Sequence, residues 1–443
     1  MSAPLKGLGS PLRSVRTESV QALTSQPDKV EELVGILENG RYQTRASVCA
    51  ALQGMGSRAK GVAPDVARLC VKEAESGAPE TATMLAATVL AMDEDAASSL
   101  ATKLAPLTSR SRAACAALGV LGEHARTAEA ALAAALAHAD RSHRTEAADA
   151  LAAIVPAAAE TATALGTAAA TTGVPALRAL ATMGGGGAPA MEGILRALDH
   201  PASLEIRYWA AYCVEKLGPA GAPAVTALVK CRQMPRDLRY SDGSMARLVD
   251  AQCDTAIQAI GDAAHQELQK VVLASQDKAH ALSRDEMNTI LSVLRSMPPL
   301  SPECVPVLVK RFADRYARKE ALYAIERMGP AGKAALPAVV KLLEEIKDVR
   351  ELHAPLAMVV AVDKQQMPTF VEDVADRVIP VLKAGGTKAH ESHPTIMVCA
   401  PWLSRSYADK VAAAIKATNQ HFLKDEDEKK AWFARWGTEL PTP

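Results

Sequence analysis

Residues 206–225 read IRYWAAYCVEKLGPAGAPAV, and a related stretch, ARKEALYAIERMGPAGKAALPAV, occupies residues 317–339. In both stretches apolar residues stand at x, x+4, x+7, x+8 and x+11, a spacing that places them on one face of a helix. Gly218 and Gly329 follow the last apolar residue, and a Pro comes a few residues later. Because Gly commonly ends helices and Pro begins them, the pattern predicts a helix, a tight turn and a second helix.

The same spacing recurs along most of the chain. It fits residues 249–260 and 48–55 closely. Looser copies end at Met92, Leu121, Ile154, Met183 and Met297. Weaker copies end near Val362 and Leu403. Successive copies end about 34 residues apart on average. A period of roughly 30 to 45 residues that contains two helices is typical of an α-solenoid. We therefore predict an all-α fold, an α-solenoid of roughly eleven helix pairs.

The repeated sequence also resembles a known family. Residues 207–211, LGPA at 217–220 and APAV at 222–225 are similar to HEAT repeats of the short subtype found in phycobilisome lyases. The resemblance covers roughly residues 10–405 and implies HEAT-like helix pairs. It places Arg207 and Arg318 at or near a position where such repeats often carry an Arg at the start of the first helix. Most members of the family are scaffolds and binding platforms and a few are enzymes, so the resemblance implies architecture more than chemistry.

Composition limits the class of protein and divides the chain. The 443 residues are 49% hydrophobic, with 50 Lys+Arg against 50 Asp+Glu, which excludes a disordered chain and a strongly cationic binder. Of the 4 Trp, 7 Tyr and 4 Phe, only Tyr42 precedes residue 201. We predict Ala-rich N-terminal repeats over residues 1–200, C-terminal repeats over 201–405 with an inserted basic loop at 231–245, and C-terminal capping helices and tail over 406–443.

Basic and aromatic residues of the second half are the candidate binding residues. The partner-binding residues that we predict are Tyr208, Arg236, Arg239, Tyr240, Arg315 and Arg318. Two interpretations are open for them. Exposed Arg and Tyr would suit an acidic partner or a phosphate backbone. Alternatively, nearby carboxylates such as Asp314 and Glu320 pair with the Arg, and the rings pack into the repeat core.

The sequence holds no recognisable catalytic or metal-binding set. The eight Cys show no CxxC, which predicts reduced, mostly buried thiols rather than a disulfide framework or a zinc site. His390 and His393 stand three residues apart, but no second cluster would complete a metal site. We expect a polar loop there, no metal, no cofactor and no enzymatic activity.

The predicted function is a non-enzymatic scaffold or adaptor that binds a protein partner, with an acidic surface or peptide, through the solenoid surface. The alternative is a nucleic-acid-binding or DNA-base-processing HEAT-like protein, although a net charge of zero counts against it. We expect a cytoplasmic location and no membrane span, and we leave self-association open. Residues 420–438, with an acidic start and the aromatics Trp432, Phe433 and Trp436, are expected to cap the last repeat; docking a partner is the alternative.

Overall fold

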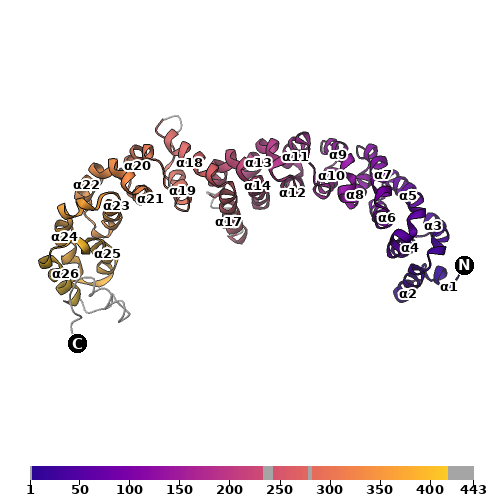
Figure 1. Cartoon of the computed structure of the whole chain (residues 1–443), viewed down its shortest axis with the longest axis horizontal. Helices are drawn as coiled ribbons and strands as arrows, with labels where there is room; N and C mark the ends of the chain where they lie inside the picture. The colour runs from indigo at the N-terminus through magenta and orange to yellow at the C-terminus, as the bar shows by residue number, and fades with distance from the viewer. Residues whose placement is uncertain (1, 233–242, 278–281, 418–443) are drawn as a thin grey trace. The chain divides into compact units, whose positions relative to one another are not determined.

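The computed structural model describes residues 2–232, 243–277 and 282–417, with residues 386, 390 and 393 described by backbone alone. Across these residues the regular elements are α-helices and short 3-10 helices, with no strand (Figure 1). The predicted all-α class is confirmed. The chain forms two compact units, Met1–Ala264 and His265–Pro443. No helix in the described part of the chain is long and apolar enough to cross a bilayer.

The helices that begin in the first unit are α1 (Ala3–Gly7), α2 (Arg13–Thr24), α3 (Val30–Asn39), α4 (Tyr42–Met55), α5 (Ala63–Ser76), α6 (Pro79–Met92), α7 (Glu94–Leu104), α8 (Arg112–Leu121), α9 (Glu129–Ala135), α10 (Arg141–Ile154), α11 (Ala159–Thr172), α12 (Val174–Thr182), α13 (Met191–Leu198), α14 (Leu204–Leu217), α15 (Val225–Arg232), α17 (Gly243–Ile260) and α18 (Asp262–Ala274). Those that begin in the second unit are α19 (Arg284–Leu294), α20 (Val305–Lys310), α21 (Arg315–Met328), α22 (Leu336–Glu345), α23 (His353–Asp363), α24 (Val371–Ala384), α25 (Gly386–Cys399) and α26 (Arg405–Ala417). The 3-10 segments are η1 (Pro27–Lys29), η2 (Gly56–Val62), η3 (Ala105–Leu107), η4 (Gly122–Ala128), η5 (Gly184–Ala190), η6 (Gly218–Ala224), η8 (Pro302–Cys304), η9 (Arg311–Ala313), η10 (Gly329–Ala335), η11 (Val349–Glu351), η12 (Lys364–Thr369) and η13 (Ala400–Trp402).

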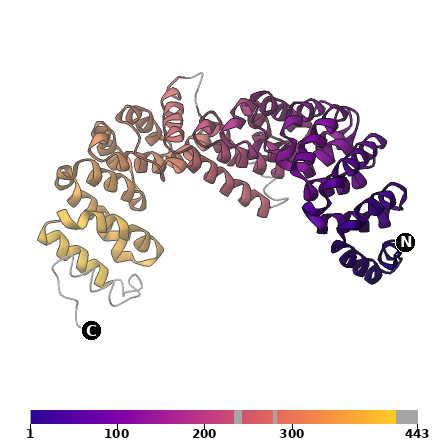
Figure 2. The ribbon, with the colours of Figure 1, turned by 45° about the vertical axis from the view of Figure 1, so that its right-hand side comes forward.

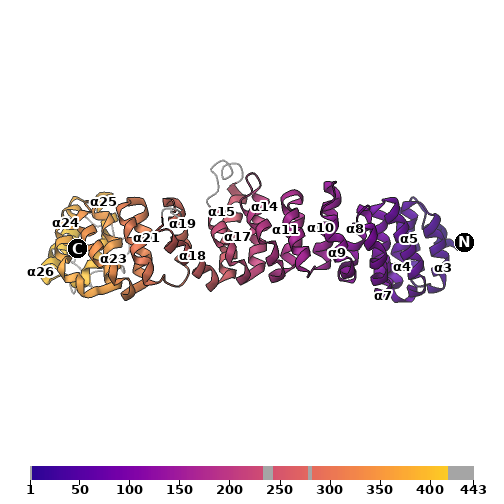
Figure 3. The same ribbon diagram turned by 90° about the horizontal axis from the view of Figure 1, so that it is seen from above.

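In each unit the helices stack in two rows. In the first unit α2, α4, α6, α8, α10, α12, α14 and α17 each pack on the next, and in the second unit α19, α21, α23 and α25 do the same. The intervening helices form the other row (Figure 1), and Figures 2 and 3 show the pairs from two further directions. Because each pair buries its apolar face against its neighbours, the architecture is an α-solenoid. The repeat number and the boundaries at residues 200 and 405 stay predictions.

Most of the repeated apolar positions lie in the core, as the spacing predicted, although Ile206 and Ala324 are only half-buried. All five residues of the copy at 249–260 are buried, and so are Ala210, Cys213, Val214 and Leu217 on α14. One loose copy was placed wrongly at its end, because α19 stops at Leu294 and Met297 lies beyond it. The spacing therefore identified the buried helix face fully at residues 249–260 and for four of five positions in each of the copies at 206–217 and 317–328.

The predicted tight turn is a seven-residue 3-10 segment that recurs five times, as η2, η4, η5, η6 and η10. Each begins with a Gly whose φ lies between 52° and 58°. At Gly218 and Gly329 ψ is −134° and −137°, a backbone conformation essentially restricted to Gly. Gly therefore ends the first helix of the pair, and the 3-10 segment leads into the second.

Small residues bring the helices of the first unit into close contact. A Cβ built on Gly193 in α13 would overlap the carbonyl oxygen of Gly166 in α11. A Cβ on Gly119 in α8 would lie 3.2 Å from the Cα of Ala150 in α10. The Ala-rich and Gly-containing sequence thus permits backbone approaches that larger side chains would prevent.

The structure describes the cysteines, residues 390–393 and the two ends of the predicted 231–245 loop. All eight Cys are free and buried, as expected, and burial raises the pKa of the Cys70 thiol to about 12. The polar loop expected at His390–His393 is wrong, because these residues lie within α25, where Ser392 and Thr395 are buried. In the predicted 231–245 loop, Cys231 and Arg232 end α15 and residues 243–245 begin α17. The rest of that loop and the predicted cap at 420–438 lie outside the described residues.

Candidate partner-binding site

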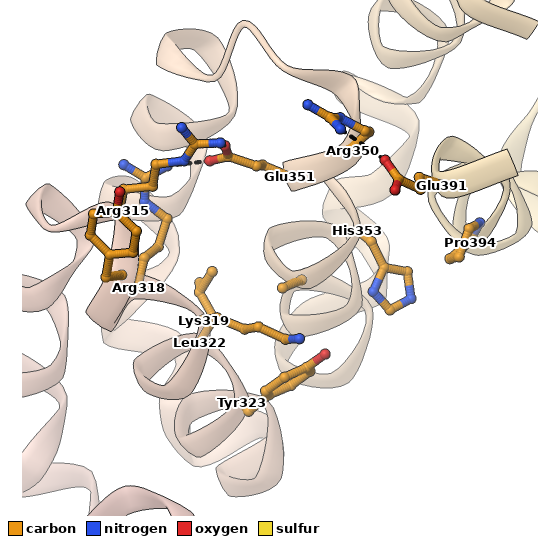
Figure 4. A pocket seen from close by; sticks show the side chains of 12 residues that line it. Arg315, Arg318, Lys319, Leu322, Tyr323, Arg350, Glu351, His353, Glu391 and Pro394 are labelled. Atoms are coloured by element: carbon orange, nitrogen blue, oxygen red, sulfur yellow. Dashed lines mark hydrogen bonds and ion pairs between the residues drawn. The ribbon is translucent and has the colours of Figure 1, made fainter. Parts of the chain in front are cut away.

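A cavity of about 400 Å³ opens on the second unit, where α21, η11 with the start of α23, and α25 lie side by side (Figure 4). Its charged lining comprises four cationic side chains and two carboxylates. The cations are Arg315, Arg318, Lys319 and Arg350, and the carboxylates are Glu351 and Glu391. Its less polar lining comprises Tyr316, Leu322, Tyr323, Ala354 and Pro394. The cavity therefore combines a cationic excess with apolar and aromatic surface.

The start of α21 sets the position of the basic residues. The Asp314 carboxylate caps the helix by accepting a hydrogen bond from the Tyr316 backbone N–H at 2.9 Å. From that cap, Arg315, Arg318 and Lys319 follow at the spacing of one helix face. The cavity wall continues along the same face with Leu322 and Tyr323.

Glu351 pairs with Arg315 and Arg318, the two arginines at the start of α21. Its carboxylate lies 2.7 Å from Arg315 Nη2 and 3.2 Å from Arg318 Nη1. Both arginines are thus ion-paired, but the predicted partners Asp314 and Glu320 were wrong, because the carboxylate that pairs with them belongs to the next repeat. The nearby carboxylates act elsewhere, since Asp314 caps α21 and Glu320 lies 3.0 Å from Arg295.

Arg318 also has a structural role. Its Nε donates to the backbone oxygen of Phe312 at 2.9 Å, just before its own helix. Arg207 Nε donates likewise to the backbone oxygen of His200 at 2.7 Å, and Arg144 Nη1 donates to the backbone oxygen of His138 at 2.8 Å. An Arg at the start of the first helix of a pair is the position named by the HEAT resemblance. Its hydrogen bond therefore connects this helix to the segment that follows the preceding helix.

Arg350 lines the side of the cavity opposite α21 and forms two ion pairs there. Its guanidinium pairs with Asp348 at 2.6 Å and with Glu391 of α25 at 2.8 Å. The hydrogen bonds from Arg350 lower the pKa of Asp348 to about 2. Both contacts hold the guanidinium in place at the edge of the cavity, and the pair with Glu391 is drawn in Figure 4.

Lys319 and His353 lie between these two ion-pair groups. Among the described residues no carboxylate forms an ion pair with Lys319, whose ammonium lies 5.7 Å from the centre of the Tyr323 ring. His353 is half-buried, and its burial together with the Lys319 charge lowers its pKa. The imidazole is therefore neutral at pH 7, and Lys319 is the cation most available to a ligand.

Two tyrosines present aromatic surface beside the cations. Tyr316 is 72% exposed, and the Arg284 guanidinium lies 5.3 Å from its ring centre. Tyr323 is half-buried beneath Arg295, at 4.6 Å. The Tyr316 ring is thus exposed, whereas Phe312, four residues earlier, is buried.

The six residues predicted from sequence are not all brought together. Arg315 and Arg318 share this cavity. Tyr208 lies half-buried on α14 of the first unit, in an edge-to-face cluster with Trp209 (5.9 Å), which in turn contacts Tyr212 (5.4 Å). Arg236, Arg239 and Tyr240 lie outside the described residues.

The sequence placed Tyr316 and Lys319 among the aromatic and basic residues of the second half without selecting them as binding residues, and it missed Arg350 and His353 altogether. Tyr316 and Lys319 adjoin the two predicted arginines and were readable as part of the same basic stretch. Arg350 and His353 carry no local signal, because they come from the following repeat. Aligning successive repeats at the period of about 34 residues would place them beside Arg315 and Lys319.

The comparisons with known proteins reveal structural likeness only. No protein-family model matches the chain, and no curated protein matches it. Kap121p bound to RanGTP is similar at 12% identity and a TM-score of 0.45, over 95% of this chain and 56% of the Kap121p chain. A chain from a structure of the cadherin and beta-catenin interaction is similar at 13% identity and a TM-score of 0.37, over 94% of this chain and 99% of the other.

The chain thus spans just over half of the length of the Kap121p chains that it resembles. The α-solenoid assignment rests on the stacking of this chain's own helices. Within the described residues, no group of three or more His, Cys, Asp or Glu side chains could hold a metal ion.

Proposed function

We propose that the protein is a non-enzymatic scaffold or adaptor that binds an acidic segment of a protein partner at the cavity of the second unit. The observation that carries this proposal is the convergence of Arg315, Lys319 and Arg350, from two successive repeats, on a cavity that also contains Tyr316 and Tyr323. Arg and Tyr are residue types that dominate binding energy at protein interfaces.

In this mechanism the cavity is preorganised. Glu351 and Glu391 already hold the guanidiniums of Arg315 and Arg350, so little side-chain entropy remains to be lost on binding. A partner carboxylate would bind Lys319 and the open edges of the two guanidiniums. An adjacent apolar side chain would pack on Tyr323, Leu322 and Ala354.

Several finer features belong to the same proposal. The repeats are of the short HEAT subtype, the protein works in the cytoplasm, and residues 201–405 form the binding half. The recurrence of a Gly-initiated 3-10 segment with nearly the same φ at η6 and η10 supports the repeat assignment. Tyr208, Arg236, Arg239 and Tyr240 remain proposed contributors.

The test is affinity purification of the tagged full chain from its native cell after nuclease treatment. The binding variant is Arg315→Ala/Lys319→Ala/Arg350→Ala. The matched control is Lys341→Ala on α22, where the exposed lysine forms an ion pair with the exposed Glu345 and with no other carboxylate in the described part of the chain. We expect the wild type and the control to retain the same protein partner and the triple variant to lose it. Retention by all three proteins would contradict the proposal, and nuclease-sensitive recovery of nucleic acid would favour the alternative function.

A further inference from the structure

We infer that Cys231 on α15 and Cys253 on α17 form a redox-sensitive pair, in which a peroxide oxidises Cys231 and Cys253 then closes a disulfide between the two helices. Both thiols are free and buried. The inference goes beyond the proposed function, since the pair lies in the first unit and the cavity lies in the second. The disulfide would join successive helix pairs by a covalent bond that a thiol can reverse.

The end of α15 lies against the middle of α17. The two helices pack on each other (Figure 3). Arg232 Nη1 on α15 lies 3.3 Å from Asp254 Oδ1 on α17. One residue earlier on each helix, the thiols of Cys231 and Cys253 are hydrogen-bonded to each other. Two neighbouring contacts thus bring the two sulfur atoms together.

A buried guanidinium lies beside this pair. Arg207, at the start of α14, is 5% exposed, and its side chain is hydrogen-bonded to Cys231. Among the residues that the structure describes, no carboxylate forms an ion pair with Arg207. Arg318, at the equivalent position of α21, lies 3.2 Å from the Glu351 carboxylate. Cys231 therefore stands where another repeat places an anion, which favours the thiolate form of this residue.

The surroundings of Cys231 separate it from the other cysteines. The hydrogen bond from Cys253 lowers the pKa of Cys231 and the Arg207 charge adds to this effect, although burial and Asp250 oppose it. The same hydrogen bond, together with burial, raises the pKa of Cys253, and burial alone raises the pKa of Cys213 on α14. Because the thiolate is the nucleophile, Cys231 is the residue that reacts first and Cys253 the residue that resolves the product.

The reaction consumes one peroxide, for which hydrogen peroxide is the simplest reagent. The Cys231 thiolate attacks a peroxide oxygen, the O–O bond breaks, and the sulfur becomes a sulfenic acid as hydroxide leaves. Cys253 gives its proton to that hydroxide and attacks the Cys231 sulfur. The S–S bond forms as the S–O bond breaks, and the second hydroxide takes up the proton that Cys231 lost on ionising. Two thiols and one peroxide thus yield one disulfide and two waters.

Burial limits the rate of this reaction. The side chains of Cys231 and Cys253 are 2% and 0% exposed. Cys231 is the last residue but one of α15, and the ends of helices open locally more readily than their interiors. The oxidant therefore reaches Cys231 when the end of α15 opens, and we expect slower oxidation than at an exposed thiolate.

Mass spectrometry of the oxidised full chain tests the inference. The protein is treated with hydrogen peroxide, denatured, alkylated at its remaining thiols and digested without reduction. We expect a Cys231–Cys253 disulfide that dithiothreitol removes. Cys49 and Cys70 are an internal control, because these buried thiols also interact but burial raises both pKa values. We expect at least fivefold more of the Cys231–Cys253 disulfide than of a Cys49–Cys70 disulfide.

Two variants separate the roles of the thiols, with dimedone as the probe for sulfenic acid. Arg207 still faces Cys231 in Cys253→Ala, so we expect dimedone to label Cys231 at least fivefold more than in the wild type, because the resolving thiol is missing. In Cys231→Ala we expect no more labelling of Cys253 than of Cys213. The matched control Cys213→Ala should leave the yield of the Cys231–Cys253 disulfide unchanged.

A yield of this disulfide no higher than that of Cys49–Cys70 would overturn the inference. So would a disulfide of mixed isotope in an equal mixture of unlabelled and ¹⁵N-labelled protein, because it would join two chains. Equal labelling of Cys253 in Cys231→Ala and of Cys231 in Cys253→Ala would contradict the order of reaction. The wild-type mapping needs no substitution, so it decides the matter even where a variant fails to fold.

Discussion

Arg315 and Arg318 lie three residues apart on α21, yet their surroundings assign them different roles. The Arg315 side chain is 63% exposed and makes one ion pair, whereas the Arg318 side chain is 18% exposed and also bonds the Phe312 carbonyl. An exposed ion pair contributes little to stability, but a part-buried hydrogen bond from a charged group contributes more. The sequence could identify both as basic residues on one helix face, but it could not separate a binding Arg from a structural one.

The two arginines should therefore differ on substitution. We expect Arg318→Ala to lower the free energy of unfolding by about 1–3 kcal/mol, since it leaves the Phe312 carbonyl without its donor. Arg315→Ala should change it by less than about 0.5 kcal/mol while weakening partner binding. Urea unfolding of the full chain measures both, and similar losses of stability in the two variants would contradict the assignment.

Glu326 on α21 gives a pH-dependent prediction. Its Oε2 is buried without a hydrogen-bond partner among the described residues, and burial raises the pKa of the carboxyl group. A raised pKa means that the folded protein binds the proton more tightly than the unfolded chain does. The charged form therefore costs stability above the folded-state pKa, and stability recovers as the pH falls through that pKa.

Glu326→Gln removes this cost, so it should stabilise the protein at pH 7. The advantage should disappear as the pH falls to the unfolded-state pKa of about 4.3. Thermal unfolding of wild type and variant across this pH range provides the measurement. A variant that is less stable than the wild type at pH 7 would show that the carboxylate has a stabilising partner.

At the scale of elements, the apolar spacing and the Gly-Pro sequences were sufficient to predict helix pairs and their turns. They did not predict the seven-residue 3-10 segments, because the i, i+3 bonding of these segments has no distinct apolar period. They also did not predict α25 over His390–His393, where polar residues suggested a loop. Ser392 and Thr395 are nevertheless buried there, and the Thr395 hydroxyl donates to the Val349 carbonyl oxygen at 3.3 Å.

The close packing of α11 and α13 gives a prediction at this scale. Gly193→Ala places a methyl group against the backbone of Gly166, which cannot rotate away as a side chain could. We expect a loss of about 1–3 kcal/mol, the usual cost of overpacking. Gly185→Ala in η5 is the matched control, because nothing lies within 4 Å of its Cβ position. Urea unfolding followed by circular dichroism measures the free energy of unfolding of each variant. Equal free energies for both variants and the wild type would contradict the close contact of α11 and α13.

For the whole molecule, the repeat period predicted an α-solenoid, since a mean spacing of about 34 residues requires stacked helix pairs. The two compact units meet in the sequence at Ala264 and His265, whereas the aromatic content changes near residue 201. The boundary near residue 201 marks a change in the residue types of the chain. The boundary at residues 264 and 265 marks a change in which helices pack together. The two boundaries therefore need not coincide. Likewise, single residues such as Arg315 were visible in sequence, but a cavity shared by three repeats appears only when the repeats are stacked.

We propose that the cavity lined by α21, α23 and α25 binds an acidic segment of a protein partner. The most direct measurement is the affinity of the purified full chain for the partner recovered from cells, compared among wild type, Arg315→Ala/Lys319→Ala/Arg350→Ala and Lys341→Ala. We predict at least tenfold weaker binding for the triple variant, a loss of about 1.4 kcal/mol or more, and unchanged binding for Lys341→Ala. Equal affinity of the triple variant and the wild type, with both proteins folded, would contradict the claim.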